Sequence, residues 1–239
     1  MTERTPLAGY QHIKEIALVP GLVQRDWRER LSDYFYLWLV DHGFLRALYN
    51  NRYRIAGGLY RSGQLSPDQV RGLSSRLGLK TLVNLRGLNE SAPFVRLETE
   101  ASVGRGLRFF ITRTWSRGLL TRSELLELID FIRRMELPAL VHCKSGADRV
   151  GHFSVLYRHL RLGEPMEQAV SELHWKYGHL AGARTGMLDH FFATYLRERR
   201  PFQSFVDWVD KDYDPERVRE SFKPVGWKSW FVDHVLGRE

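Results

Sequence analysis

One short segment of the chain combines a cysteine, a glycine and an arginine at a spacing that suits phosphate chemistry. The segment HCKSGADR, residues 142–149, places Cys143, the only cysteine, six positions before Arg149. The planar guanidinium of an arginine binds two oxygens of a phosphate group at once, which the ammonium of a lysine does not do. Gly146 lets the backbone approach a ligand closely. The pattern therefore predicts a phosphate-binding loop that begins at Cys143.

The elements predicted on either side of this segment favour anion binding. Residues 139–142 (ALVH) form a predicted buried strand, and a predicted helix covers residues 150–162. In a strand-to-helix turn, successive N–H groups converge and the helix N-terminus adds partial positive charge. The same field favours the thiolate of Cys143, which would attack phosphorus and form a phosphocysteine that water then hydrolyses. The alternative is that Cys143 is a small buried apolar residue, as many free cysteines are.

The other residues of the segment have predicted supporting roles. The loop backbone would hold the phosphate oxygens, with Lys144, Ser145, Gly146 and Ala147 as substrate-binding residues. The side chain of Lys144 would add a second positive charge beside the substrate. His142 would hydrogen-bond the turn and hold its shape. No metal ion and no cofactor is expected to take part.

Strands and helices alternate along the chain, which indicates an α/β fold with a central, mostly parallel sheet of about four to five strands flanked by helices. Strand predictions cover residues 53–61, as a hairpin around Gly57 and Gly58, and residues 80–86, 107–112 and 139–142. Helix predictions cover residues 26–49, 66–77, 95–103, 123–135, 150–162, 166–177 and 187–197. The phosphate-binding loop is thus expected at the end of a buried strand.

Composition limits the classes of protein and ligand. The chain has 239 residues, 43% hydrophobic and 27% charged, as in globular proteins. One cysteine excludes an intrachain disulfide framework and any multi-cysteine metal site. We find no apolar run long enough to span a bilayer and no apolar core of a secretory signal, so a cytoplasmic location is expected. The net charge of +8 favours anionic partners, but there is no nucleic-acid-binding motif and nucleic acid is not expected.

Two further stretches bear on how a substrate would be presented. Residues 101–123 hold five arginines and no acidic residue, which fits either a solvated loop or an electropositive lip over a site for a polyanion. Near the C-terminus, five residues share one helical face: Trp227, Trp230, Phe231, His234 and Val235. For this face, and for the predicted helix at 26–49, packing on the domain's own core is favoured over an interfacial position. A peripheral membrane contact stays an open alternative.

The segment HCKSGADRVG resembles the active-site signature of the cysteine-dependent protein tyrosine and dual-specificity phosphatase superfamily. Upstream, LYRSGQLSPDQV and GLKTLVNLRG are similar to the N-terminal part of small bacterial dual-specificity-like phosphatases. The resemblance implies a phosphatase domain at residues 51–200, between an N-terminal helical extension (1–50) and a C-terminal, partly helical tail (201–239). It also implies Cys143 as nucleophile, Arg149 as phosphate clamp, and a phosphorylated protein, phospholipid or small phosphate ester as substrate.

The chain departs from that family at the residue that protonates the leaving oxygen. The family usually carries an aspartate on a mobile loop upstream of the cysteine. The matching residues 112–121 (TRTWSRGLLT) include no acid, and Arg117, which cannot donate its proton at working pH, stands in its place. Asp148 is the predicted replacement, as in the myotubularin-type phosphatases that this chain resembles there, with Glu90 and Glu124 as further candidates. The alternative is that Asp148 pairs with a neighbouring arginine and stays ionised.

Two other positions affect turnover and substrate contact. Val150 follows the arginine where the family usually has serine or threonine, which assists breakdown of the phosphoenzyme; Ser145 is a partial substitute. Arg86 ends a predicted central strand, at the edge where α/β sheets bind ligands, and either contacts substrate or forms a structural ion pair.

Three functions follow from these features. The leading one is a phosphomonoesterase that works through Cys143. A sulfurtransferase or arsenate-reducing protein also presents a cysteine-led anion loop, but lacks the upstream YRSG and NLRG segments found here. The third is a non-catalytic phosphate-binding module, or pseudophosphatase, that has lost its acid.

Overall fold

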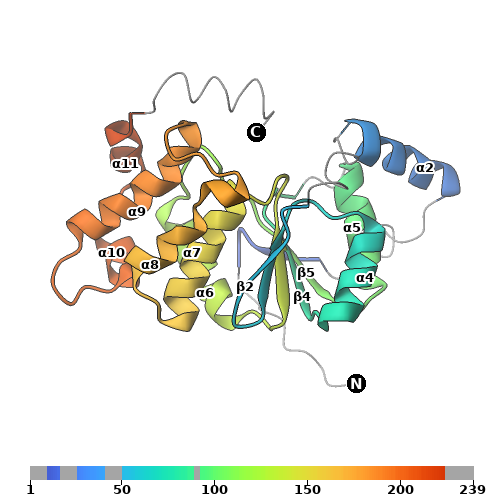
Figure 1. The fold of residues 1–239 in the computed structure, drawn as a ribbon, viewed down its shortest axis with the longest axis horizontal. Helices are drawn as coiled ribbons and strands as arrows, with labels where there is room; N and C mark the ends of the chain where they lie inside the picture. The colour runs from blue at the N-terminus through green and yellow to red at the C-terminus, as the bar shows by residue number, and fades with distance from the viewer. Residues whose placement is uncertain (1–9, 17–25, 41–49, 89–91, 224–239) are drawn as a thin grey trace.

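A six-stranded sheet forms the centre of the computed structural model, which describes residues 10–16, 26–40, 50–88 and 92–223 (Figure 1). The strands are β1 (Lys14–Glu15), β2 (Tyr53–Ala56), β3 (Leu59–Ser62), β4 (Thr81–Asn84), β5 (Arg108–Ile111) and β6 (Ala139–His142), in the spatial order β1-β5-β4-β6-β3-β2. The four inner strands run parallel, and the edge strands β1 and β2 are antiparallel to their neighbours. The predicted α/β class is confirmed, with one more strand than expected.

Helices cover both faces of the sheet (Figure 1). One face carries α4 (Pro67–Leu77) and α5 (Pro93–Val103), and α2 (Trp27–Phe35) packs on α5. The other face carries α6 (Arg122–Arg134), α7 (Asp148–Leu162), α8 (Met166–Ala169), α9 (Met187–Glu198), α10 (Phe205–Lys211) and α11 (Pro215–Ser221). Each face has its own apolar core, and the larger lies under α6, α7 and α9. The sheet is therefore buried on both sides, as parallel sheets usually are.

Local signals in the sequence fix the ends of several helices. Ser66 caps α4 by accepting a hydrogen bond from the backbone N–H of Gln69, whose side chain in turn caps the Ser66 N–H. Thr121 and Glu124 form the same reciprocal capping box at the start of α6. Such boxes satisfy backbone donors that the first helical turn leaves free. The predicted helix starts at these positions are confirmed to within one residue.

The helix predicted at residues 26–49 differs from the structure in length and in the face it buries. After α2 the chain continues as a π-helical turn (Tyr36–Val40), and residues 41–49 lie outside the described part of the chain. Core packing is wrong for the apolar side chains Leu31, Phe35 and Leu39, which are exposed. The buried face instead carries Asp33, which forms an ion pair with Arg96 of α5.

The single helix predicted at residues 166–177 is also wrong. The chain forms α8, a 3-10 turn (Val170–Glu172) and a second 3-10 turn (Trp175–Tyr177). The backbone of His174 is extended, and its ring nitrogen accepts a hydrogen bond from the Lys176 N–H, so that a new turn begins there. This break allows Glu172 and Tyr177 to contact the same buried arginine, described below.

The described part of the C-terminal tail packs on the main core. Phe205, Trp208 and Val209 of α10 are buried beside the aromatic side chains of α9. The boundary predicted at residue 200 stays a prediction, and the apolar face at residues 227–235 lies outside the described residues. Within the described ranges, no helix has both the length and the apolar composition needed to cross a bilayer.

Candidate active site

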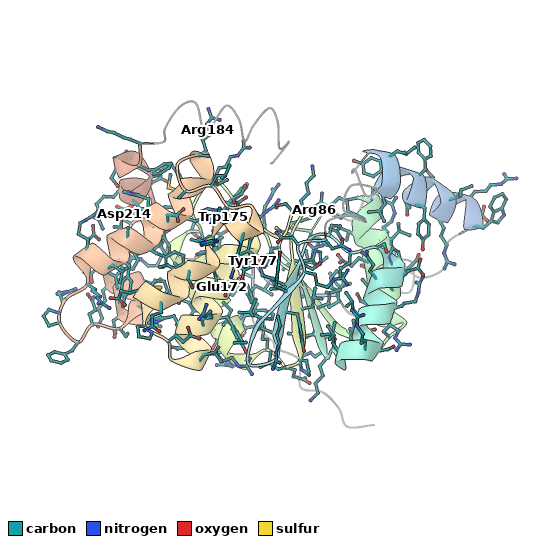
Figure 2. All side chains as sticks on the ribbon, viewed as in Figure 1. Arg86, Glu172, Trp175, Tyr177, Arg184 and Asp214 are labelled. Carbon is teal, nitrogen blue, oxygen red and sulfur yellow. The ribbon has the colours of Figure 1, made fainter. Side chains whose placement is uncertain are left out.

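The parallel strands end at one edge of the sheet, and the residues predicted to bind phosphate follow them there. Cys143 comes directly after β6, which lies between β4 and β3. Arg86 follows β4 and forms an isolated bridge with Arg113, which follows β5. Figure 2 shows Arg86 at the upper edge of the sheet. The topology therefore brings Arg86, Arg113 and the cysteine loop to the carboxyl edge, where α/β sheets bind ligands.

The loop after Cys143 turns its carbonyl groups away from its own centre. Four successive carbonyls accept hydrogen bonds from outside the loop: Lys144 from the Gln64 N–H (3.2 Å), Ser145 from Asn51 Nδ2 (3.0 Å), and Gly146 and Ala147 from Arg61 Nη2 (2.9 and 3.2 Å). A peptide whose C=O points outward points the next N–H inward. The arrangement therefore leaves backbone donors facing the centre, as a concave anion site requires.

Gly146 allows this loop to close against the end of β3. Its φ of +72° lies in the left-handed region, and a Cβ at this position would come within 2.7 Å of the Gly63 nitrogen. Its N–H donates a hydrogen bond of 3.2 Å to Cys143 Sγ. The sulfur is therefore held by the loop, although Cys143 is only 2% exposed and also touches the apolar core. Cys143 therefore also has the burial expected if it were only a small apolar core residue.

Arg149 is buried without a negative partner. It is 9% exposed, and in the part of the chain that the structure describes its guanidinium forms no hydrogen bond and no ion pair. Arginines are almost never buried this deeply unless a partner balances their charge. At the first turn of α7, next to a ring of backbone donors, this positive charge is available for an anionic ligand.

Arg61, which our reading of the sequence did not select, holds the loop from below. It is fully buried, and its Nη1 donates to a carboxylate oxygen of Glu172 at 2.7 Å. Its guanidinium stacks 3.7 Å from the ring centre of Tyr177. Burial lowers the pKa of Arg61, while Glu172, Tyr177 and the nearby Cys143 thiol oppose that shift. Figure 2 shows Glu172 and Tyr177 side by side next to the sheet.

Asp148 forms a buried ion pair with a histidine. Its Oδ1 lies 2.8 Å from Nδ1 of His179, and the other ring nitrogen of His179 lies 2.6 Å from Oδ2 of Asp189. Burial alone would lower the pKa of His179, but the hydrogen bonds to Asp148 and Asp189 raise it from 6.5 to about 9. Asp148 therefore has a cationic partner at neutral pH, and that partner is a histidine instead of the arginine considered above.

Two curated sequences are similar to this chain, and both are the dual specificity protein phosphatase TpbA of Pseudomonas aeruginosa. The match to the protein of strain UCBPP-PA14 is 27% identical over 125 residues, 52% of this chain and 53% of the relative. The match to the protein of strain PAO1 is 28% identical over 131 residues, 54% of this chain and 56% of the relative. The sequence of this chain is thus similar to that of dual specificity protein phosphatases. It spans about half the length of the curated relatives it matches.

Among solved structures, P. aeruginosa TpbA in complex with pTyr aligns over 72% of this chain and 89% of its own chain, at 24% identity and a TM-score of 0.47. Tk-PTP in its active form covers 64% of this chain and 99% of its own at 19% identity and a TM-score of 0.48. No family model matches the sequence.

The phosphatases that the sequence resembles usually carry an acid on the loop that corresponds to residues 112–121. Here that loop places Arg113 over the ring of Trp115, 4.7 Å from its centre. Of the two further acid candidates, Glu124 is occupied in the capping box of α6 and Glu90 lies outside the described residues. Asp148 is thus the candidate that the structure places in the cysteine loop itself.

The electropositive lip predicted at residues 101–123 is only partly formed. Arg108 pairs with Glu15 and Glu136 at the amino end of β5, away from the site. Arg105 and Arg122 donate hydrogen bonds to Ser74 and to the Tyr213 carbonyl. Arg113 and Arg117 are the two of the five that follow the carboxyl end of β5. The site edge is therefore less basic than the sequence count suggests.

His142 does not make the hydrogen bond to the turn that the sequence predicts. Its Nε2 lies 2.7 Å from a carboxylate oxygen of the buried Glu98, and neither ring nitrogen hydrogen-bonds the loop. Glu98 also accepts a hydrogen bond from the side chain of Gln64, whose backbone N–H donates to Lys144. The support that His142 gives the loop is thus indirect.

Arg86 is held in place close to the loop. Its Nη1 donates to the Gln64 side chain at 3.0 Å, and its guanidinium stacks 3.7 Å from the ring centre of Phe94. Lys144 and Ser145 are half-buried at the mouth of the site. Val150 is fully buried in the core and offers the loop no hydroxyl.

Proposed function

We propose that the protein is a phosphatase that hydrolyses phosphate monoesters through a phosphocysteine on Cys143. The observation that carries this proposal is the buried Arg149, which has no partner among the described residues, beside a loop in which four successive carbonyls point outward. A phosphate dianion would supply the negative charge that Arg149 lacks and accept the inward N–H donors. The similarity to dual specificity protein phosphatases supports the same reaction.

In the first step, the Cys143 thiolate attacks phosphorus, an S–P bond forms, and the P–O bond to the leaving group breaks. The Gly146 N–H, the N-terminus of α7 and the charge of Arg149 favour the thiolate over the thiol. Arg149 and the loop backbone bind the phosphoryl oxygens as charge redistributes. Asp148 gives its proton to the departing oxygen, since it is the acid next to Arg149 in the loop.

In the second step, water attacks the phosphocysteine, the S–P bond breaks, and phosphate leaves with the thiolate restored. The Asp148 carboxylate takes a proton from the attacking water and returns to its acid form. Val150 offers no hydroxyl to assist the departing sulfur, so we expect this step to be slow relative to the first.

We propose a phosphorylated protein as the substrate, with phosphoinositides and other anionic phospholipids as the competing class. The curated relatives are protein phosphatases, which favours the former. Lys144, Arg86 and Arg113 at the site edge suit either class. A cytoplasmic location and a peripheral membrane contact both stay predictions.

The test uses the purified full chain with p-nitrophenyl phosphate, with and without vanadate. We expect vanadate to block turnover and Cys143→Ser to abolish it. The control variant His190→Asn should leave turnover unchanged. Turnover by Cys143→Ser equal to that of the parent would overturn the mechanism. Phosphotyrosine and phosphoserine peptides, phosphoinositide vesicles and sugar phosphates then rank the substrate classes.

The second candidate function is a phosphate-binding pseudophosphatase. It is favoured by the absence of an acid in residues 112–121 and by the cationic partner of Asp148. A protein that binds vanadate and phosphopeptides through Arg149, yet turns over none of the esters, has this function.

A further inference from the structure

Three titratable side chains form a line from the cysteine loop to the surface. Asp148 begins α7, His179 follows the 3-10 turn Trp175–Tyr177, and Asp189 lies in the first turn of α9. Successive atoms lie 2.8 and 2.6 Å apart, within hydrogen-bond distance at both junctions. The side chains of Asp148 and His179 are 3% and 1% exposed, whereas that of Asp189 is 34% exposed. Only the outer end of the line therefore reaches water.

The two contacts fix the charge of the histidine. An imidazole can donate from both ring nitrogens only when it is protonated, and here both nitrogens meet carboxylate oxygens. The titratable group against the ring from α7 is Asp148, and the one from α9 is Asp189. Among the described residues these are the charged groups that contact it, and no three acidic, histidine or cysteine side chains there could hold a metal ion. The cluster is therefore an imidazolium that donates to Oδ1 of Asp148 and to Oδ2 of Asp189.

The segment that carries His179 is attached to the cysteine loop at other points as well. Asn51 Nδ2 donates both to the Ser145 carbonyl and to the Tyr177 carbonyl, at 3.0 and 2.8 Å. Tyr177 also lies under Arg61, which binds the loop carbonyls. The segment that carries His179 is thus also anchored by contacts that do not involve Asp148.

We propose that His179 is a positioning residue for Asp148 in the phosphatase reaction, and that Asp189 holds His179 in its protonated, correctly oriented form. This inference rests on the proposed function. The imidazolium orients the Asp148 carboxyl group and stabilises the carboxylate that remains after its proton has passed to the leaving oxygen. It holds the same carboxylate ready to take a proton from the water that attacks the phosphocysteine.

The proposal predicts a dependence on the leaving group. Acid catalysis matters most when the leaving oxygen is a poor leaving group, so the loss of His179 should affect phenyl phosphate more than p-nitrophenyl phosphate. Phosphate binding by Arg149 and the loop amides does not use the imidazolium. We therefore expect the effect in kcat/KM, which reports the step that forms the phosphocysteine, with little change in the affinity for vanadate.

The experiment compares His179→Asn and Asp189→Asn with the control His190→Asn, whose parent side chain hydrogen-bonds Ser221 and does not contact His179. For His179→Asn we expect kcat/KM for phenyl phosphate to fall about tenfold to a hundredfold, with a smaller loss for p-nitrophenyl phosphate. In the parent, kcat/KM should fall as the pH rises through about 9, where His179 loses its proton, and this limb should be absent in His179→Asn. Asp189→Asn, on the exposed end, should change both readouts in the same direction by a smaller amount.

Equal losses with both esters, or an unchanged pH profile, would overturn the positioning role. If His179→Asn fails to fold, the result for Asp189→Asn decides. The proposed function is tested separately, because a parent protein that hydrolyses none of the esters contradicts the phosphatase activity itself. In that case, the ring nitrogen signals of His179 in NMR still show whether the chain of charges exists, since they should stay protonated up to about pH 9.

Discussion

Arg61 donates a hydrogen bond of 2.9 Å to the carbonyl of Gly146 from a position that is fully buried beneath the cysteine loop. The two residues are 85 positions apart in the sequence. This contact, together with the one to Ala147, fixes the direction of two peptide groups and thereby of the N–H groups that face a ligand. The rigidity of the candidate anion site thus depends on Arg61, a positively charged side chain that lies beneath the loop and does not itself face the ligand.

We expect Arg61→Met to reduce phosphate affinity and turnover together, since the Gly146 carbonyl loses this donor and Glu172 keeps only its ion pair with Arg158. Breaking a buried ion pair from one side typically costs about 3–5 kcal/mol. Urea unfolding and vanadate titration measure the two effects. As a control, Arg71→Met removes an exposed ion pair with Asp68 and should change the free energy of unfolding by less than about 1 kcal/mol. Normal vanadate binding by folded Arg61→Met would contradict the role given to Arg61.

Gly146→Ala should prevent the loop from closing. The new Cβ would lie 2.7 Å from the Gly63 nitrogen, and the φ of +72° disfavours any residue with a side chain. We expect loss of vanadate binding and of turnover, measured by titration and by p-nitrophenyl phosphate assay. Gly72→Ala is the matched control, because a Cβ there meets nothing within 4 Å and alanine favours the helix. A fully active Gly146→Ala protein would show that the loop has a different conformation.

His152 should make the fold sensitive to acid. Burial lowers the pKa of His152 from 6.5 to about 4, so the folded protein holds this ring neutral while the unfolded chain protonates it below pH 6.5. Its contribution to stability is therefore complete above pH 6.5 and falls as the pH drops toward 4. The loss is on the order of 3 kcal/mol. The difference between the unfolding midpoints at pH 5 and pH 8 should be smaller in His152→Leu than in the parent. The same difference in both proteins would mean that the His152 ring is hydrated in the folded protein.

His179 should make the fold sensitive to alkaline pH, the opposite of the effect of His152. Its pKa is raised to about 9, so its contribution to stability is complete below pH 6.5 and is lost as the pH rises through 9. We expect the parent to lose stability between pH 7 and pH 10, and His179→Asn to lose less over the same interval. Thermal melts across this range check the prediction, with His190→Asn as the control. Parallel curves for His179→Asn and the parent would show that the ring is neutral.

Thr121→Ala should weaken the start of α6 without affecting the site. The threonine oxygen accepts from the Glu124 N–H, and the loss of such a cap costs about 1 kcal/mol. Chemical unfolding should show this loss while kcat for p-nitrophenyl phosphate stays unchanged. A strong loss of activity would instead point to Glu124 as the acid, since the cap holds its side chain.

Much of the fold is predictable because its signals are local. The alternation of strands and helices, the capping residues Ser66 and Thr121, and the loop glycine all act within a few positions of the chain. Two predictions fail where tertiary contacts prevail over local pattern. The apolar face of α2 is exposed because Asp33 pairs with Arg96, and the helix at 166–177 breaks where its residues meet Arg61.

The residue pattern predicts the candidate site: a cysteine, an arginine and a glycine in one loop between a strand and a helix. Those residues are neighbours in the chain, and their spacing alone defines an anion site. Only the tertiary structure decided what supports them, because Arg61, Asn51 and His179 reach the loop from distant segments. The topology of the sheet sets which distant residues meet, and no local pattern in the chain encodes those contacts.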